Sequence, residues 1–253
     1  MLMPNIQRFI VIACEILFRE VCFCASKSKN IVDVVFQKKA LHDIGEAEMY
    51  KALQNAVNQV DHEKYDAILL AYGLCNNGIK NLHAPIPMVV PRAHDCIALL
   101  MGSKEKYADY FANNPGAYYH SSGWLERNAH DENSVMHQLG IANSYDEYVD
   151  EYGEDNAEYL MSMLGNWLVN YSKVAFINNG IGDVDNNRAK SKALAEENNW
   201  AFDEVEGNIS LIERLIEGEW DESDFLVIPP NCKVEPSHDS GIVKCSLKEA
   251  HQC

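Results

Sequence analysis

Short apolar runs alternate along the chain with a longer segment in which apolar positions recur every three or four residues. The runs at 8–14, 31–36, 67–73 and 87–91 predict buried strands, because each run is mostly apolar and polar or turn-forming residues bound it. Between the second and third runs, residues 45–60 show the amphipathic spacing of a helix. This order of elements predicts parallel βαβ units joined by right-handed crossovers.

The same pattern divides the chain into four parts. Residues 1–102 are predicted to form a first α/β half, and residues 103–170 a helical insertion or cap, because aromatic and turn residues there give way to carboxylate-rich helical spacing. A second α/β half is expected over 171–235, followed by a polar C-terminal tail at 236–253. The predicted fold class is α/β, with open parallel sheets flanked by helices and two Rossmann-like halves separated by the insertion.

Composition narrows the classes of function. With 47% hydrophobic residues, 253 residues are ample for a packed core, and a net charge of −17 opposes binding to nucleic acids or anionic lipid surfaces. No apolar run is long enough for a membrane span, and charged residues interrupt the N-terminal stretch, so a cytoplasmic protein is expected. In a reducing compartment, the eight cysteines favour metal binding or catalysis over disulfides.

Three cysteines stand where predicted strands end. Cys14 closes the first strand, Cys75 follows the third, and Cys96 follows the fourth, with His94 two residues before it. The carboxyl ends of neighbouring parallel strands meet at one edge of a sheet, so these side chains are expected to converge. Thiolate and imidazole ligands suit zinc or iron, which makes Cys14, Cys75, His94 and Cys96 a candidate metal site. A small buried hydrophobe remains the alternative role for Cys14.

The segment PRAHDC supplies the candidate catalytic residues. Arg92 and His94 alternate to the same side of an extended chain, and could present a cation and an imidazole to one pocket. His94 could also lower the pKa of the Cys96 thiol. Asp95 is a candidate partner that orients His94, but as the N-cap of the following helix it has a simpler role, which we favour.

Glycines and an aromatic segment suggest where a ligand could approach. Gly73, Asn76 and Gly78 lie in the turn after the third strand, where glycine lets a ligand come close to the backbone. Trp124 belongs to an aromatic segment that could line the same pocket or could pack over the edge of the core. The segment NNGIGD matches neither a dinucleotide fingerprint nor a P-loop, so ordinary strand-to-helix turns remain the alternative.

Four blocks of sequence carry a family resemblance. They are YGLCNNG at 72–78, PRAHDCIALLMGSKEKY at 91–107, PGAYYHSSGW at 115–124 and DFLVIPP at 224–230. Together they resemble the domain of unknown function 1638 family. Members occur in anaerobes and methanogens, often beside corrinoid-dependent methyltransferase systems, so the resemblance implies a metabolic setting but no mechanism. A corrinoid protein or methyltransferase is the partner that it implies.

Three functions follow as hypotheses. The first is a zinc- or iron-dependent protein that acts on a small molecule in corrinoid-linked one-carbon metabolism, as a transferase or lyase if it is an enzyme. The second is a metal-free enzyme with Cys75 and Cys232 as acid and base, similar to the aspartate/glutamate racemases. The third is a non-catalytic accessory protein that binds a corrinoid or another tetrapyrrole.

Overall fold

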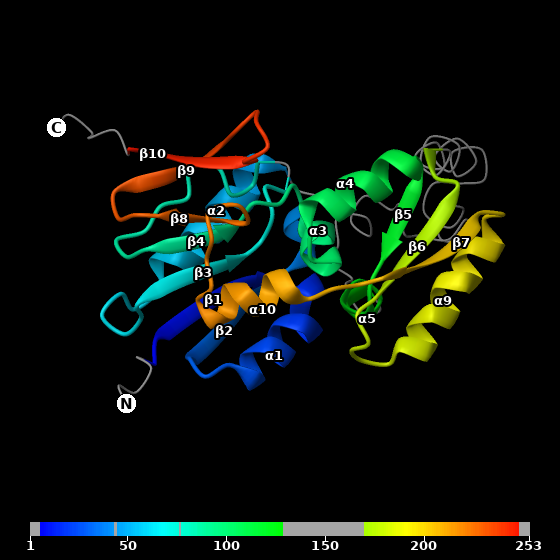
Figure 1. The fold of residues 1–253 in the computed structure, drawn as a ribbon, viewed down its shortest axis with the longest axis horizontal. Coiled ribbons are helices and arrows are strands. Elements are labelled where there is room, and N and C mark those ends of the chain that lie inside the picture. The colour runs from blue at the N-terminus through cyan, green and yellow to red at the C-terminus, as the bar shows by residue number, and fades with distance from the viewer. Residues whose placement is uncertain (1–5, 43–44, 76, 129–169, 248–253) are drawn as a thin grey trace, which may run out of the picture.

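The computed structural model describes residues 6–42, 45–75, 77–128 and 170–247 as two sheets with helices on their faces, together with a two-stranded hairpin (Figure 1). Sheet A has the strand order β2-β1-β3-β4-β8, and sheet B has the order β5-β6-β7. The strands of sheet A are β1 (Arg8–Cys14), β2 (Ile31–Gln37), β3 (Ala67–Ala71), β4 (Met88–Pro91) and β8 (Phe225–Ile228). Those of sheet B are β5 (Ala117–His120), β6 (Lys173–Asn178) and β7 (Ala201–Glu206).

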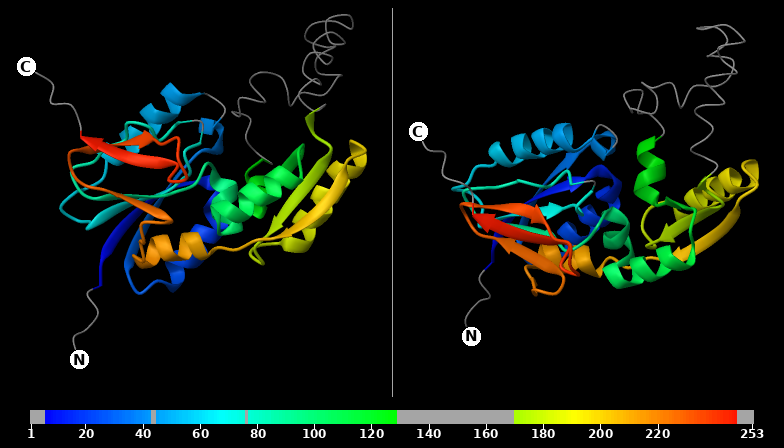
Figure 2. Two further views of the ribbon diagram at one scale, coloured as in Figure 1. Left: turned by 45° about the horizontal axis from the view of Figure 1, so that its top comes forward. Right: turned by 90° about the horizontal axis from the view of Figure 1, so that it is seen from above.

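The helices follow from the direction of each crossover. From β1 the chain passes through η1 (Glu15–Leu17) and α1 (Phe18–Lys27) to β2 on one side, then through η2 (Lys39–His42) and α2 (Glu46–Asn58) to β3 on the other side. Right-handed crossovers in opposite directions place α1 and α2 on opposite faces of sheet A, as Figures 1 and 2 show. The carboxyl ends of β1 and β3 therefore flank a topological switch point, where α/β proteins bind ligands.

Sheet B is inserted between two parts of sheet A. After α3 (Cys96–Met101), the chain forms α4 (Lys104–Asn113), β5, α5 (Ser122–Asn128), β6, α9 (Val184–Glu197) and β7. It then returns through α10 (Ser210–Glu217) to β8, which pairs antiparallel with β4. All strand pairs in sheet B and the other pairs in sheet A are parallel. The predicted α/β fold class with open, mostly parallel sheets is thus confirmed.

The topology cuts across the predicted division at residues 102, 170 and 235. Strand β5 lies in the segment expected to be a helical insertion, yet it pairs with β6 of the expected second half. Strand β8 of that second half pairs with β4 of the first. The segment expected to be a polar tail contains β10 (Val243–Leu247), which pairs with β9 (Cys232–Pro236). The carboxylate-rich stretch 129–169 lies outside the described residues.

The core of sheet A is continuous because its central strands are covered on both faces. Every residue of β3 and β4 is buried, as are the last six of the seven residues of β1. Such unbroken apolar runs are typical of strands packed between two helical layers. Helix α10 packs against α1, β3 and β4 on one face and buries Leu211, Ile212, Leu215 and Ile216. In the part of the chain that the structure describes, no helix has both the length and the apolar character of a membrane span.

Helix α1 also holds the two sheets together at a polar seam. Arg19 pairs with Glu126 of α5 at 2.8 Å, and Glu20 Oε1 accepts a hydrogen bond of 3.4 Å from Asn179 Nδ2, beyond the end of β6. Glu20 is 1% exposed, and its Oε2 has no partner among the described residues. Burial raises the pKa of this carboxyl, with the charge of Glu126 adding to the effect.

We predict that Glu20→Gln stabilises the protein at alkaline pH by about 1–3 kcal/mol, because it replaces a buried charge with a neutral amide of nearly the same shape. A carboxyl with a raised pKa binds its proton more tightly in the folded state than in the unfolded state. Its charge therefore lowers the free energy of unfolding by the full amount above the folded-state pKa, and by nothing once the pH has fallen below the pKa of the unfolded chain. Urea denaturation at pH 8 and pH 5.5 measures the effect, which should shrink at the lower pH.

The control is Glu126→Gln, on the other side of the same seam. This change breaks a partly exposed ion pair and is expected to lower stability by less than about 1 kcal/mol. Equal effects of the two substitutions at pH 8 would contradict the role given to burial of Glu20.

Candidate functional site

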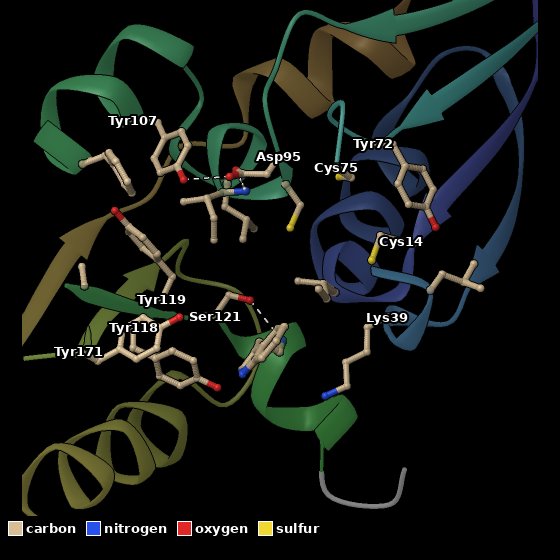
Figure 3. A pocket seen from close by; sticks show the side chains of 18 of the residues that line it. Cys14, Lys39, Tyr72, Cys75, Asp95, Tyr107, Tyr118, Tyr119, Ser121 and Tyr171 are labelled. Atoms are coloured by element: carbon tan, nitrogen blue, oxygen red, sulfur yellow. Dashed lines mark hydrogen bonds between the residues drawn. The ribbon is translucent and has the colours of Figure 1, made fainter. Parts of the chain in front are cut away.

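A cavity of about 470 Å³ lies between the two sheets, at the carboxyl ends of β1, β3 and β4. Its volume falls within the range of small-molecule sites. Figure 3 shows Cys14, Tyr72 and Cys75 on one side of it and four tyrosines on the other, and Cys96 also lines it. We call these two sets of side chains the thiol wall (Cys14, Tyr72, Cys75 and Cys96) and the tyrosine wall (Tyr107, Tyr118, Tyr119 and Tyr171).

The thiol wall is built by sheet A. Cys14 is the last residue of β1, Tyr72 and Cys75 follow β3 directly, and Cys96 is the first residue of α3. The predicted convergence of the three cysteines on one cavity is therefore observed. It follows from the strand order β1-β3-β4, which puts the three strand ends side by side.

The loops after β3 and β4 are held together through their backbones. Leu74 N–H donates to the carbonyl of Ala93 at 2.8 Å, and Cys75 N–H donates to the carbonyl of His94 at 2.9 Å. Gly73 permits this approach, since a Cβ atom there would lie 2.5 Å from the Asp95 nitrogen. Cys75 itself adopts a left-handed backbone with φ of 44°, which is uncommon for a residue other than glycine.

Burial keeps all three thiols in their neutral form. It raises the pKa of Cys14 to about 11 and that of Cys75 to about 12. The pKa of Cys96 is also raised well above its ordinary value, by burial first and then by the negative charge that Cys14 and Cys75 would carry as thiolates. The Tyr72 hydroxyl has a raised pKa for the same reasons. At neutral pH the thiol wall is uncharged and weakly nucleophilic.

Asp95 caps helix α3. Its Oδ1 accepts from the backbone N–H groups of Ile97 at 2.9 Å and Ala98 at 3.4 Å, and its Oδ2 accepts from the Tyr107 hydroxyl at 2.8 Å. Capping, the role favoured from the sequence, is thus what the structure shows. The bond to Tyr107 also joins the two walls of the cavity, because Tyr107 belongs to α4.

Arg92 and His94 do not line this cavity. His94 is exposed, and only its backbone carbonyl contacts the loop that carries Cys75. Arg92 donates to the carbonyls of Glu222, Gly241 and Val243, and so ties the β9–β10 hairpin to sheet A. The cavity that the thiols line is therefore not the pocket that the two residues were expected to share.

The other candidate ligand-binding residues have different surroundings. Gly78 leaves room for Met49 of α2, whose Sδ would lie 2.1 Å from a Cβ atom at that position. Trp124 lines the cavity, and the Lys39 ammonium lies 4.7 Å from the centre of its ring. Asn76 lies outside the described residues.

Sequence reasoning missed several members of the site. The aromatic segment that includes Tyr118, Tyr119 and Trp124 was expected near a pocket, but nothing distinguished Tyr72, Tyr107 or Lys39 from other residues of their elements. Tyr72 stands one residue past β3, and such positions at strand ends are the signal that could have found it. Lys39 is 7% exposed although it follows a strand in a polar stretch.

The sulfur atoms do not form a ready-made metal centre. Across the described ranges, no group of three or more histidine, cysteine, aspartate or glutamate side chains is arranged so that it could hold a metal ion. The seven cysteines in these ranges are all free thiols. The structure thus brings together three protonated thiols, which are soft potential ligands, in one wall of the cavity.

Fold and cavity together define an α/β protein with a thiol-lined pocket at the switch point of a mostly parallel sheet. The profile of the family described as "Protein of unknown function (DUF1638)" matches residues 36–216, and the chain belongs to that family. The family resemblance seen in the sequence blocks is thereby confirmed. Comparison with curated proteins and with solved structures finds no match.

We predict that Gly73→Ala destabilises the protein by about 3 kcal/mol or more, since the added methyl group meets backbone atoms that can move only if the two loops separate. Chemical denaturation gives the loss of stability. Gly180→Ala is the control, because its Cβ would meet nothing within 4 Å and only its φ of +69° opposes alanine. That change should cost about 1 kcal/mol, and a similar value for Gly73→Ala would show that the loops tolerate separation.

Proposed function

We propose that this protein binds a soft metal ion, zinc or iron, through Cys14, Cys75 and Cys96, and that the ion acts on a small molecule held in the cavity. The observation that supports this most directly is the convergence of three thiols from three separate strand ends on one cavity. A purely structural role would not require sulfur at all three positions, because other small residues can fill a core.

The electrostatics of the thiol wall support a cation as its occupant. Burial opposes the thiolate form of all three cysteines, and repulsion from neighbouring thiolates adds to this for Cys75 and Cys96; a divalent cation reverses both effects. Thiolate sulfur selects soft or borderline ions such as zinc and iron over calcium or magnesium. In this proposal the thiols are neutral without metal and lose their protons as the ion binds.

Metal binding then requires the cysteine side chains to reorient, since the described residues hold no preformed group of ligands. His94 is exposed on the other side of its loop, so the proposed ligand set consists of the three thiols alone. Three protein ligands leave a position for a substrate, which is the arrangement of catalytic zinc sites. That position would face the tyrosine wall, and the ion would act there as a Lewis acid.

The family resemblance supports a setting for this chemistry. The corrinoid systems that often accompany the family suggest a small molecule of one-carbon or methyl metabolism as substrate, and a corrinoid protein or methyltransferase as partner. Under this proposal any reaction is a transfer or lyase reaction at the metal. The corrinoid itself would belong to the partner.

Neither alternative function finds comparable support. The racemase-like scheme needs Cys75 and Cys232 in one site. Strand β8 runs antiparallel to β4, so Cys232, which follows β8, lies toward the amino ends of the parallel strands, away from Cys75. The scheme also needs a thiolate at Cys75, whose pKa burial raises to about 12. For a tetrapyrrole accessory protein the axial ligand would have to be a residue other than the exposed His94, which does not line the cavity.

We predict that protein purified anaerobically without a chelating tag, and reconstituted with zinc or ferrous iron, holds about one equivalent of metal. Cys14→Ser, Cys75→Ser and Cys96→Ser should each weaken binding by at least about 100-fold, because the loss of an outer partner alone costs 10–100-fold. Elemental analysis and competition with a chromophoric chelator measure both quantities. Cys232→Ser is the matched control and should leave binding unchanged. Wild-type protein that holds no stoichiometric metal under reducing conditions refutes the proposal.

We further predict that metal affinity rises steeply with pH. Since the pKa values of Cys14 and Cys75 are about 11 and 12 and that of Cys96 is also raised, binding at pH 6–8 must displace up to about three protons. The logarithm of the association constant should therefore rise with pH with a slope of up to about three. Calorimetry in buffers of different ionisation enthalpy counts the protons released. An affinity independent of pH would mean that the thiols are not the ligands.

A further inference from the structure

One edge of sheet A is open. Strand β2 is the outermost strand on its side of the sheet, and within the described ranges no other strand pairs with its outer edge (Figure 1). Asp33 is its one charged residue, and it contains neither lysine nor proline. Every residue of β2 is exposed or half-buried, and the side chains of Ile31 and Val35 are 44% and 40% exposed. Proteins rarely leave an apolar strand of this kind open at a sheet edge, because it pairs readily with another chain.

The other edges of sheets A and B are protected. Strands β5 and β8 have only four residues each, and the β9–β10 hairpin packs against β8. Strand β7, at the far edge of sheet B, carries Asp203, Glu204 and Glu206. Short strands, charged side chains and covering segments are the usual means of keeping an edge unpaired. Strand β2 has seven residues and little charge, so its edge is the one suited to a partner.

The bonds between β2 and β1 determine which backbone groups of β2 are open. The N–H of Ile31 donates to the carbonyl of Gln7, just before β1, at 2.9 Å, so the backbone groups of Ile31 face β1. The same holds for every second residue of β2, since backbone groups in a parallel strand alternate between its two sides. Val32, Val34 and Phe36 therefore direct their N–H and C=O groups away from the sheet, where a further strand can pair with them.

This pattern is complementary to itself. Val34 is the middle residue of β2 and also one of the three that face outward. A second copy related by a two-fold axis at Val34 runs antiparallel, so Val34 meets Val34 and Val32 meets Phe36 of the other copy. All the outward groups are then paired, in about six hydrogen bonds, and β-branched side chains lie opposite aromatic or β-branched ones. A shift of register would leave part of the strand without a partner.

The local charge of β2 lets two copies meet, although each carries a net charge of −17. Asp33 Oδ2 accepts from the Lys64 ammonium at 2.7 Å and from the Tyr65 hydroxyl, so the charge of the strand is offset within its own copy. In the two-fold register each Asp33 lies opposite Val35 of the other copy. The acidic surface elsewhere therefore opposes this contact only at long range, where salt screens it.

We infer that β2 pairs with β2 of a second copy of this chain, so that the two A sheets join into one across a two-fold axis. Such a dimer requires no metal. It bears on the site because the carboxyl end of β2 leads directly into Lys38 and Leu41, which line the cavity. Pairing places Ile31 of one copy opposite Gln37 of the other, next to that segment.

Sedimentation velocity of the full-length, metal-free protein in reducing buffer measures the association. Between about 1 μM and about 1 mM the mass should rise from that of one chain, 28.5 kDa, toward twice that value. Added salt should strengthen the association, because it screens the repulsion between two acidic copies. A mass that stays at one chain overturns the inference. An association that salt weakens also overturns it, since ion pairs would then hold the copies together.

Val34→Pro tests the edge itself. The lost N–H faces outward, so β2 keeps its bonds to β1 and the monomer should fold, as circular dichroism can check. The dimer loses the bonds at its two-fold axis, so its dissociation constant should rise at least about tenfold. Association as strong as that of the wild type would place the interface elsewhere and overturn the inference.

The matched control is Phe202→Pro on the charged edge of sheet B. Its N–H also faces outward, because the N–H of the preceding residue, Ala201, donates to the carbonyl of Ser172 just before β6. This change should leave the association of the two copies unchanged.

A cysteine pair decides the register even if proline unfolds the chain. In Val34→Cys the two Cα atoms at position 34 would lie about 5.5 Å apart, within the range of a disulfide. Oxidised glutathione should therefore link two copies, and mass spectrometry of the peptides should identify the 34–34 bond. In the control Val35→Cys the two positions are diagonal, about 7–8 Å apart, and should link poorly. No link in Val34→Cys, or equal yields in both variants, overturns the inference.

Discussion

The approach of two backbones, at the loops that follow β3 and β4, is the constraint on which the site depends. Two main-chain hydrogen bonds join Leu74 to Ala93 and Cys75 to His94, and the missing side chain of Gly73 allows them to form. This contact fixes Cys75 beside the start of α3, and thus beside Cys96. It also orients Asp95, which caps that helix and holds Tyr107 of the opposite wall. One pair of loops therefore positions residues in both walls of the cavity.

The cavity combines groups that lack their usual partners. In the thiol wall, burial raises the pKa of the three thiols and so disfavours the thiolate form that binds a metal. Around the same space, the Tyr119 hydroxyl and the Trp124 indole N–H are buried without acceptors. A protein of net charge −17 thus keeps an uncharged sulfur surface inside, where a metal ion would find little competition from water. Such arrangements trade stability for binding, as functional sites commonly do.

Much of this architecture could be predicted from the sequence, because the local pattern of apolar residues reflects which positions are buried. Apolar runs predicted β1 to β4, helical spacing predicted α2, and the positions of Cys14, Cys75 and Cys96 at strand ends predicted their convergence. Side-chain alternation predicted that Arg92 and His94 lie on the same side of the chain. It could not say which side of the loop faces the cavity, since that depends on elements distant in sequence.

The remaining differences arise from long-range pairing. No local signal in the segment 225–228 distinguishes an antiparallel partner of β4 from a strand of the second sheet, so the boundaries drawn along the chain miss the return of β8. The same holds for Lys39 and Tyr72, which lie in ordinary surroundings in the sequence and meet the cavity only through the fold. Contacts between a residue and the other sheet cannot be predicted from the residues next to it in the sequence.

The insertion of sheet B has a consequence for biosynthesis. During translation β4 emerges long before β8, at rates of roughly 5–20 residues per second, and every residue of β4 is buried in the finished fold. Until the ribosome has made all of sheet B, one edge of β4 has no strand beside it, and an open apolar edge is a template for pairing with other chains. The nascent polypeptide therefore passes through a stage at which this edge of β4 is unpaired, and the stage ends only after residues 225–228 have been made.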